Sequence, residues 1–190
     1  MKYRTMLCTG HPRSGTHYIA ALMSVNFLKD EDYLKIYRNH ELPDMVQDPD
    51  TAHIYVWRGF EGTARSIYVL KERFGLNVES YEAFLANRYS EMWGVENPDN
   101  VVTNVKTLHE RGSFKGISDF FEKVEMTPRE FWEYYNGVWE ACAKKNPNVV
   151  SVRYEDIMEA FEPAMTSVAS RLGSELKAFK NIDRKVGWWK

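Results

Sequence analysis

The sequence predicts an α/β domain with three layers, in which helices cover both faces of a parallel β-sheet. Two observations support this fold class. The chain has 190 residues, of which 44% are hydrophobic, so it can bury one sizeable core. Short apolar runs that suit buried strands alternate along the chain with segments of helical periodicity. Strands separated by helices pair in parallel through right-handed crossovers. We therefore expect a single domain over residues 1–190.

The predicted strands are four short apolar runs, each followed by a change of pattern. They cover residues 5–8, 34–37, 53–57 and 149–152. Ligands of parallel sheets bind beyond the carboxyl ends of the strands. The residues expected at those ends are Gly10, His40, Arg58 and Tyr154.

The predicted helices are recognised by apolar residues at helical spacing and by residues that cap helix ends. The first helix follows a turn at residues 11–15 and carries Ile19, Leu22, Met23 and Phe27 on one face. Further helices are expected at 61–74 (ended by Gly75), 80–92, 119–124 and 163–172 (ended by Gly173).

The best-marked helix begins after Thr127. Thr127 and Glu130 form a capping-box pattern, and Pro128 loses no hydrogen bond at the first helical position. Asn146 and Pro147 end the helix. Its apolar face is predicted to hold Phe131, Tyr135, Val138, Trp139 and Cys142.

Charge and cysteine content exclude several classes of protein. The chain has 25 Lys and Arg against 27 Asp and Glu, a formal net charge of -2, which argues against a general nucleic-acid coat. No apolar run approaches the ~20 residues that span a bilayer, and no apolar stretch of the secretory type follows Met1. Cys8 and Cys142 are too few for a disulfide framework or a zinc ribbon. We expect a cytoplasmic protein with neither a membrane span nor a metal.

A glycine-containing turn at residues 10–16 separates the first strand from the first helix. Backbone N–H groups at such a turn, together with the helix dipole, make an anion site. Gly10 and Gly15 have the spacing of a Walker A motif, but Thr16 and His17 stand where Lys and Ser/Thr are required. This argues against an ordinary NTPase or kinase. The positively charged residue of this loop is Arg13, which stands before Gly15, whereas the Lys of a Walker A motif stands after the corresponding Gly.

The segment from Pro12 to Thr16 resembles the 5′-phosphosulfate loop, PKSGT or PRSGT, of the sulfotransferases that use 3′-phosphoadenylyl sulfate (PAPS). A second segment, Ile54 to Arg58 with Ser66 eight residues after the Arg, resembles the family's strand–Arg–helix–Ser segment. In that family the Arg and the Ser hold the 3′-phosphate. An Arg at a strand end can grip a phosphate bidentately, which agrees with this role.

Two later segments follow in the family's order. Residues 150–156 resemble a strand that ends in a YED motif, whose Tyr lies near the adenine, which points to Tyr154. Residues 184–190 are similar to an RKGxxGDWK segment that contacts the 3′-phosphate. This copy is two residues shorter and has Trp188 in place of the Asp, so only Arg184 and Lys185 carry over.

The resemblance also implies a reacting centre. In soluble small-molecule members the base is the His of a KTHLP segment, and here His40 occupies that place. Arg38 would replace the Lys beside the transferred sulfonate, and Arg13 would stabilise charge on the bridging oxygen. Glu41 is a rival base, because glycan- and protein-directed members use a Glu, and His17 could compete. His109 lies in a similar segment but in the wrong order along the chain.

The implied activity is transfer of a sulfuryl group from PAPS to a hydroxyl or amine, without a metal, leaving the product PAP. The acceptor class (small molecule, glycan, lipid or peptide) and the oligomeric state stay open. Two other functions compete with this one: a nucleotide or sugar kinase with a degenerate loop, and a nucleotide-binding module without chemistry. The predicted donor-binding residues are Arg13, Ser14, Gly15, Thr16, His17, Tyr18 (in place of a Trp that stacks on adenine), Arg58, Ser66, Tyr154, Arg184 and Lys185.

Aromatic side chains between residues 81 and 135 have two interpretations. They either line an acceptor cleft or pack the core, and their helical spacing favours the core. They are Tyr81, Phe84, Tyr89, Trp93, Phe120, Phe121, Trp132 and Tyr135.

Overall fold

The computed structural model describes residues 3–27, 35–43, 48–92 and 125–182. Its sheet has four strands in the order β2-β1-β3-β4, and every neighbouring pair is parallel. The predicted parallel sheet is therefore confirmed. The strands are β1 (Thr5–Thr9), β2 (Lys35–Asn39), β3 (Thr51–Trp57) and β4 (Val149–Arg153).

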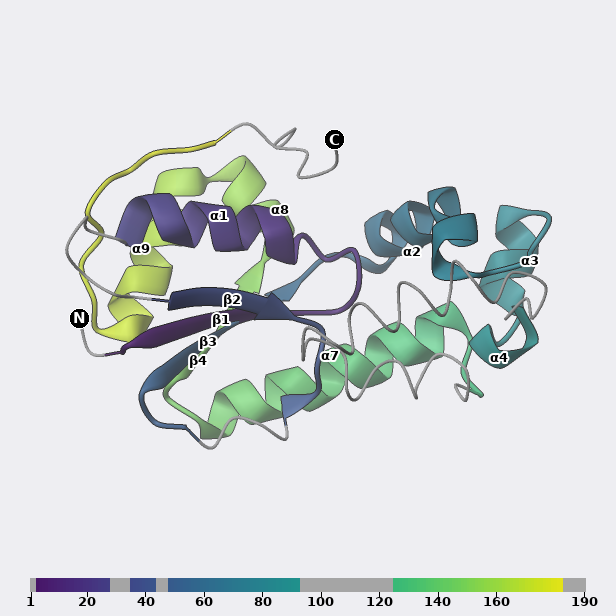
Figure 1. Cartoon of the computed structure of the whole chain (residues 1–190), viewed down its shortest axis with the longest axis horizontal. Coiled ribbons are helices and arrows are strands. Elements are labelled where there is room, and N and C mark those ends of the chain that lie inside the picture. The colour runs from purple at the N-terminus through teal and green to yellow at the C-terminus, as the bar shows by residue number, and fades with distance from the viewer. Residues whose placement is uncertain (1–2, 28–34, 44–47, 93–124, 183–190) are drawn as a thin grey trace.

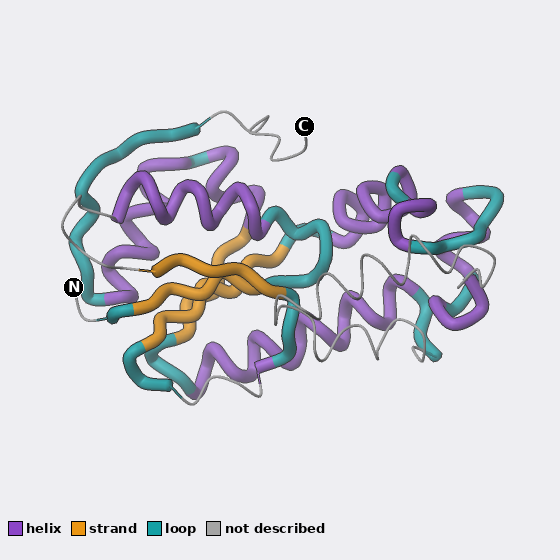
Figure 2. Tube along the Cα trace, in the orientation of Figure 1, coloured by secondary structure: helices purple, strands orange, loops and turns teal. Residues whose placement is uncertain are grey.

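Helices cover both faces of the sheet, as three layers require (Figures 1 and 2). The helices α1, α8 and α9 lie on one face and α7 lies on the other, whereas α2, α3 and α4 lie beyond the carboxyl ends of the strands. Their bounds are α1 (Thr16–Phe27), α2 (Phe60–Val69), the 3₁₀ helix η2 (Lys71–Phe74), α3 (Tyr81–Ala86), α4 (Tyr89–Met92), α7 (Pro128–Lys145), α8 (Tyr154–Glu159) and α9 (Phe161–Leu172).

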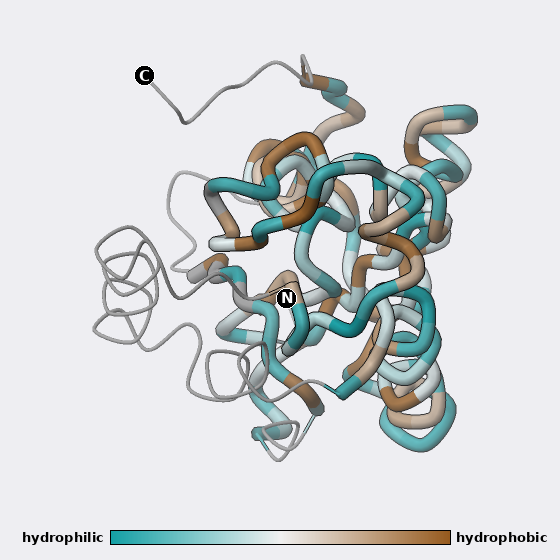
Figure 3. Tube along the Cα trace, turned by 90° about the vertical axis from the view of Figure 1, so that its right-hand side faces the viewer, coloured by the Kyte–Doolittle hydropathy of each residue, from teal (hydrophilic) through white to brown (hydrophobic). Residues whose placement is uncertain are grey.

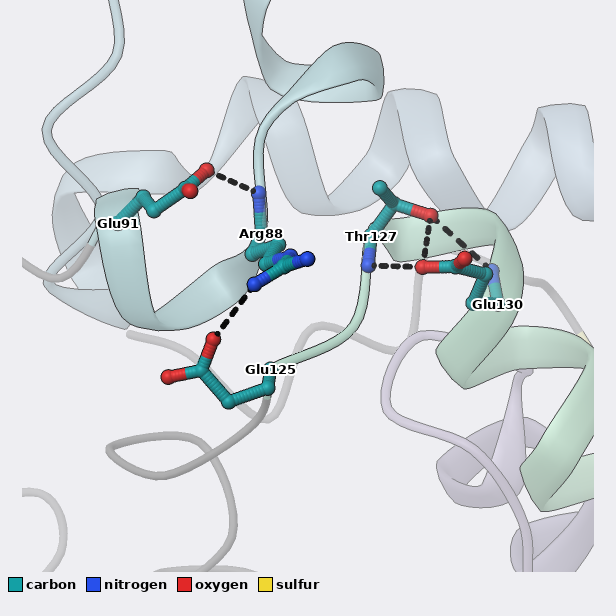
Figure 4. Close-up of polar contacts among 5 residues, drawn as sticks. All are labelled: Arg88, Glu91, Glu125, Thr127 and Glu130. Atoms are coloured by element: carbon teal, nitrogen blue, oxygen red, sulfur yellow. Dashed lines mark hydrogen bonds and ion pairs between the residues drawn. The ribbon is translucent and has the colours of Figure 1, made fainter.

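The predicted start of α7 is confirmed in detail. The Thr127 hydroxyl accepts from the Glu130 N–H at 3.4 Å, and the Glu130 carboxylate accepts from the Thr127 N–H at 2.8 Å (Figure 4). Arg88 pairs with Glu125 at 3.0 Å, and the Tyr89 N–H donates to the Met126 carbonyl at 3.0 Å. These contacts fix the beginning of α7 against α4.

Two helix predictions were wrong in extent. The predicted helix 61–74 ends at Val69, because the Leu70 N–H bonds three residues back to Ile67 and tightens the chain into η2. The predicted helix 80–92 is two helices, since the chain is extended at Asn87 and the Glu91 carboxylate caps α4 by accepting from the Arg88 N–H at 2.9 Å (Figure 4).

The end of the chain also differs from the prediction. α9 begins at Phe161, earlier than expected, and ends at Gly173 as predicted. The short helix α8 was missed, because six residues are too few to reveal a helical period. The predicted helix 119–124 lies outside the described residues.

Two clusters of buried side chains fill the space between the sheet and its helices. An aliphatic cluster, including Leu22, Met165 and Leu172, packs between the sheet and α1 and α9. An aromatic cluster, including Tyr55, Tyr135 and Trp139, packs between the sheet, α2 and α7. Hydrophobic and hydrophilic residues are interspersed along the described chain (Figure 3).

No helix in the described part of the chain is long and apolar enough to cross a membrane.

Candidate phosphate-binding and transfer site

The four strand ends bring the predicted site residues to one edge of the sheet. Gly10 follows β1, His40 follows β2, Arg58 follows β3 and Tyr154 begins α8 directly after β4. The register places Thr9 opposite both Asn39 and Tyr55, so the first three of these strands end at nearly the same level. This juxtaposition was predicted from the order of strands and helices alone.

The loop from Gly10 to Gly15 folds tightly between β1 and α1. Arg13 has φ 71° and Gly15 has φ 99°, two positive values within three residues. The Ser14 N–H donates to the His11 carbonyl at 3.0 Å. A Cβ on Gly10 would lie 2.1 Å from the Val56 carbonyl oxygen, so only glycine fits where the loop leaves β1 beside β3. The turn presents backbone N–H groups at the beginning of α1, which is the geometry of an anion site.

Two hydroxyl residues of the loop are buried. The Ser14 side chain is fully buried, and no hydrogen-bond partner for its hydroxyl is found in the described structure. Thr16 is also buried at the first position of α1. A buried hydroxyl without a partner is uncommon, and an anion held by the loop would satisfy it.

The loop cation contacts the helix that follows β3. The Arg13 Nε donates to the Ser66 hydroxyl at 2.9 Å. The sequence assigned these two residues to opposite ends of the donor, and the structure brings them into direct contact. The contact joins the loop to α2.

His40 is held against the loop backbone. Its Nδ1 lies 2.6 Å from the Gly10 carbonyl oxygen, and because a carbonyl only accepts, Nδ1 carries the hydrogen. Burial lowers the pKa of His40 to about 4; the hydrogen bond to Gly10 opposes this shift, and the charges of Arg38 and Arg13 add to it. His40 is therefore neutral at pH 7, and its Nε2 has a lone pair that can accept a proton.

The backbone beside His40 is fixed by α7. The Glu41 carbonyl accepts from the Tyr135 hydroxyl and from the Trp139 indole N–H, both at 3.0 Å. A third aromatic donor, the Trp132 indole, bonds to the Arg58 carbonyl at 3.0 Å. Thus α7 holds the ends of two strands through polar atoms of aromatic side chains.

Tyr154 lies at the centre of four residues that we call the Tyr154 cluster: Gly15, Tyr18, Arg58 and Tyr154. A Cβ on Gly15 would lie 2.5 Å from the Tyr154 ring, so the ring packs directly on the loop. The Arg58 guanidinium carbon lies 5.1 Å from the centroid of this ring, and the Tyr18 ring lies 6.0 Å from it, edge to face. No ion pair of Arg58 with a carboxylate is found among the described residues. This leaves its guanidinium suited to an anionic ligand.

Two residues of the site were missed from the sequence. His11 is buried; its Nδ1 donates to the Pro12 carbonyl at 2.8 Å, and its ring packs 4.9 Å from Phe131. Burial lowers the pKa of His11 to about 4. Glu155 accepts from the Gly59 N–H at 2.9 Å and so joins α8 to the end of β3. Only their places within motifs, beside Pro12 and Tyr154, could have pointed to them.

The remaining predicted residues are placed as follows. Arg38 is exposed on β2, and His17 is partly exposed in the first turn of α1. Among the predicted aromatic residues, Phe84, Tyr89 and Tyr135 are buried in the aromatic cluster, which agrees with a core role. The other predicted residues lie outside the described ranges; they are Trp93, His109, Phe120, Phe121, Arg184 and Lys185.

No cluster of His, Cys, Asp and Glu suited to a metal ion occurs in the ranges that the structure describes. The polar groups at this edge include hydroxyls, backbone N–H groups, the guanidiniums of Arg13 and Arg58, and the neutral imidazoles of His11 and His40. Together with the sheet topology, this loop defines an α/β protein with a P-loop type of fold.

Comparison with known proteins identifies the family. Residues 34–186 match the family described as "Sulfotransferase domain", and the chain belongs to this family. The match begins after the loop at residues 10–16. The assignment of this loop as an anion site therefore rests on the loop's geometry and not on the family match.

A solved structure has the same fold. Mouse sulfotransferase SULT7A1, whose structure was determined in complex with PAP, superposes with a TM-score of 0.56 at 17% sequence identity. The alignment covers 92% of this chain and 60% of the mouse chain, so this chain spans about 60% of the length of that sulfotransferase. No curated protein sequence matches the chain.

Proposed function

We propose that the chain transfers a sulfuryl group from PAPS to a hydroxyl or amine acceptor and releases PAP. The observation that carries the proposal is the meeting of four strand ends at one edge, where the loop, His40, Arg58 and Tyr154 lie together. Membership of the sulfotransferase family and the fold shared with a PAP-bound sulfotransferase support it.

The residues present fit the donor nucleotide. The loop N–H groups, the Ser14 hydroxyl and the start of α1 suit the 5′-phosphosulfate. Arg58 and Ser66 suit the 3′-phosphate, because one offers a guanidinium and the other retains a hydroxyl hydrogen after accepting from Arg13. Tyr18 and Tyr154 offer aromatic faces to the adenine.

His40 serves as the general base in this proposal. Its Nδ1–H donates to the Gly10 carbonyl, which orients the ring and puts the lone pair of this tautomer on Nε2, the atom that we assign to the acceptor proton. The acceptor oxygen or nitrogen then bonds to sulfur while the bond from sulfur to the 5′-phosphate oxygen breaks. The proton moves to His40 Nε2, and the electron pair leaves with PAP.

The two arginines stabilise charge during this transfer. Arg13 lies in the loop and lowers the cost of the negative charge that develops on the leaving phosphate. Arg38 lies on β2, the strand that ends just before His40, and serves the transferred sulfonate. A guanidinium stays protonated, so both act electrostatically and neither donates a proton.

The donor site is tested by calorimetric titration with PAP, with adenosine 5′-monophosphate (AMP), and with ATP and Mg²⁺. We expect tight binding of PAP without a metal and weak binding of AMP. Arg58→Ala should remove the preference for PAP over AMP, whereas Arg65→Ala, on the exposed face of the same helix as Ser66, should keep it. If the chain bound ATP with Mg²⁺ but did not bind PAP, the result would contradict the proposed function and favour a kinase.

The base is tested with [³⁵S]PAPS and a panel of phenol, sugar, amine and tyrosyl-peptide acceptors. His40→Ala should abolish transfer while PAP affinity stays within about twofold of wild type, because the imidazole acts on the acceptor. Full activity of this variant would remove His40 from the mechanism and direct attention to Glu41 or His17. Normal PAP binding with no transfer by the wild type to any acceptor would favour the module without chemistry.

A further inference from the structure

Arg58 stands two residues before α2, and its guanidinium lies against the first turn of that helix. A Cβ added to Gly62 would lie 2.8 Å from the Arg58 Nε and 3.2 Å from its guanidinium carbon Cζ. The Cα–Cβ bonds of a helix tilt toward its N-terminus, so a side chain at position 62 would point back toward Arg58. The guanidinium therefore fills the space that a side chain of residue 62 would occupy.

The second contact of this guanidinium is the ring of Tyr154, whose centroid lies 5.1 Å from Cζ. We call Arg58, Gly62 and Tyr154 the Arg58 seat. An aromatic face attracts a guanidinium without neutralising it, whereas a carboxylate would pair with its charge. Among the described residues no carboxylate forms an ion pair with Arg58. The seat therefore holds the cation in place and leaves its positive charge for an anionic ligand.

The backbone on both sides of the Arg58 carbonyl is also fixed. The Gly59 N–H donates to the Glu155 carboxylate at 2.9 Å, and the Arg58 carbonyl accepts from the Trp132 indole at 3.0 Å. Glu155 follows Tyr154 in α8, so this short helix contacts both the backbone after Arg58 and its guanidinium. With the backbone held, the position of the guanidinium depends on its own side-chain torsions and on the space that Gly62 leaves.

The presence of glycine at position 62 supports a role in this seat. Glycine is among the poorest helix-forming residues, so a glycine inside a helix calls for an explanation. The backbone does not supply one, because the described glycines with positive φ are Gly15, Gly75 and Gly173. The described helices hold one other glycine, Gly137 in α7, and a Cβ there would meet nothing within 4 Å. Of these two helical glycines, only Gly62 leaves space that another side chain fills.

We propose that Gly62 is a positioning residue that sets the specificity of this chain for a phosphate at the 3′ position of the ribose. The inference rests on the proposed function, in which Arg58 binds that phosphate. Gly62 has no side chain to offer the nucleotide, so it acts through Arg58. A guanidinium that is seated before binding loses less entropy when the nucleotide arrives, and a fixed cation favours one phosphate position over another. A mobile cation would attract a 2′-phosphate nearly as well.

The test compares three nucleotides by calorimetric titration: PAP, its isomer adenosine 2′,5′-bisphosphate, and AMP. The two bisphosphates carry the same groups and differ only in where the second phosphate lies, so the ratio of their affinities reports geometry. We expect the wild type to prefer PAP over the isomer. Gly62→Ala should lower PAP affinity about tenfold, narrow this preference, and leave AMP affinity within about twofold of wild type.

A matched control and a stability measurement separate positioning from folding. Gly137→Ala makes the same change in a helix where the new methyl group meets no neighbour, so all three affinities should stay unchanged. Gly62→Ala should fold, because the atoms that must give way belong to the far end of a flexible side chain. Alanine is also the better helix former, so the thermal midpoint of ligand-free Gly62→Ala should not fall below that of the wild type.

Coupling to Arg58 tests whether the effect passes through its guanidinium. In a chain that already carries Arg58→Ala, Gly62→Ala should change PAP affinity by less than about twofold, because the group that it would displace is absent. The same substitution in the wild-type chain should give the full tenfold loss. The difference between these two losses is the energetic coupling between the residues.

Three results would overturn the inference. An equal loss of affinity for all three nucleotides, with a lower thermal midpoint, would mean that Gly62 supports the fold alone. A wild type that does not distinguish the two bisphosphates, or an unchanged preference in Gly62→Ala, would mean that the space at position 62 sets no specificity. A tenfold loss on top of Arg58→Ala would mean that Gly62 acts through another group. The proposed function stands in each of these cases, whereas failure of the wild type to bind PAP would refute the proposed function and the inference with it.

Discussion

The two faces of the sheet are packed with different kinds of side chain. The face toward α1 and α9 is mainly aliphatic, and Asn26 is a polar exception within it. The face toward α7 is aromatic, with the Tyr55 and Trp139 rings stacked at 5.4 Å. Both faces exclude water, so burial alone does not explain the difference.

The difference lies in the polar atoms that aromatic residues carry. Tyr135 and Trp139 bury their rings in the core, and Trp132 is partly buried. Each of the three donates an O–H or N–H to a backbone carbonyl just after a strand end. An aliphatic side chain can fill the same volume but makes no such bond. The aromatic face therefore positions the site, whereas the aliphatic face mainly stabilises the fold. The predictions below test this division.

The largest expected effect is a loss of stability in acid that arises on the aromatic face. Burial lowers the pKa of His11 and of His40 from 6.5 to about 4 in the folded chain. Between pH 6.5 and 4 the unfolded chain binds these protons and the folded chain does not, so stability falls as the pH falls through this window. Each imidazole contributes up to about 3 kcal/mol to that loss.

This prediction is checked by urea unfolding at pH 7 and at pH 4.5. His11→Gln should lose less stability than the wild type between the two values, because glutamine does not titrate. An identical loss in both proteins would show that His11 is not buried in its neutral form.

A cavity on the aliphatic face should lower stability without harming the site. Met165→Ala removes a fully buried side chain on α9 and should cost about 3 kcal/mol. Once corrected for the unfolded fraction, PAP affinity at 25 °C should not change. A large drop in PAP affinity of the folded variant would contradict the division between the faces.

Removing one hydroxyl from the aromatic face should do the reverse: it should lower stability only a little and harm the site. Tyr135→Phe keeps the ring and deletes the bond to the Glu41 carbonyl, at a cost of about 1 to 2 kcal/mol in stability. The rate of transfer should fall about tenfold, because the backbone next to His40 loses its support. Tyr68→Phe, which loses a bond to the Glu79 carbonyl at the surface, is the control and should keep the full rate.

The smallest effect is expected at the start of α7. Thr127→Ala deletes one half of the capping box and should cost about 1 kcal/mol by thermal unfolding. Neither PAP affinity nor the transfer rate should change. A clear change in either would mean that α7 positions the strand ends through its first turn as well as through its aromatic residues.

The sequence by itself determined the parallel pairing of the sheet and which residues stand at its strand ends. Strands of short apolar runs, a glycine loop and the capping box at Thr127 are local patterns, and local sterics and hydrogen bonds are enough to fix them. The order of strands and helices then implied that Gly10, His40, Arg58 and Tyr154 meet at one edge, as the structure confirms.

Only the tertiary structure decided how those residues act on one another. The contacts Arg13–Ser66, Tyr135–Glu41 and Asn26–Lys180 join residues that are 53, 94 and 154 positions apart. The break between α3 and α4 likewise depends on the Glu91 carboxylate capping a new helix, which periodicity does not reveal. Hydrogen bonds between distant residues depend on packing, and so does the burial of His11 and His40. A local sequence pattern does not show which distant side chains will pack together.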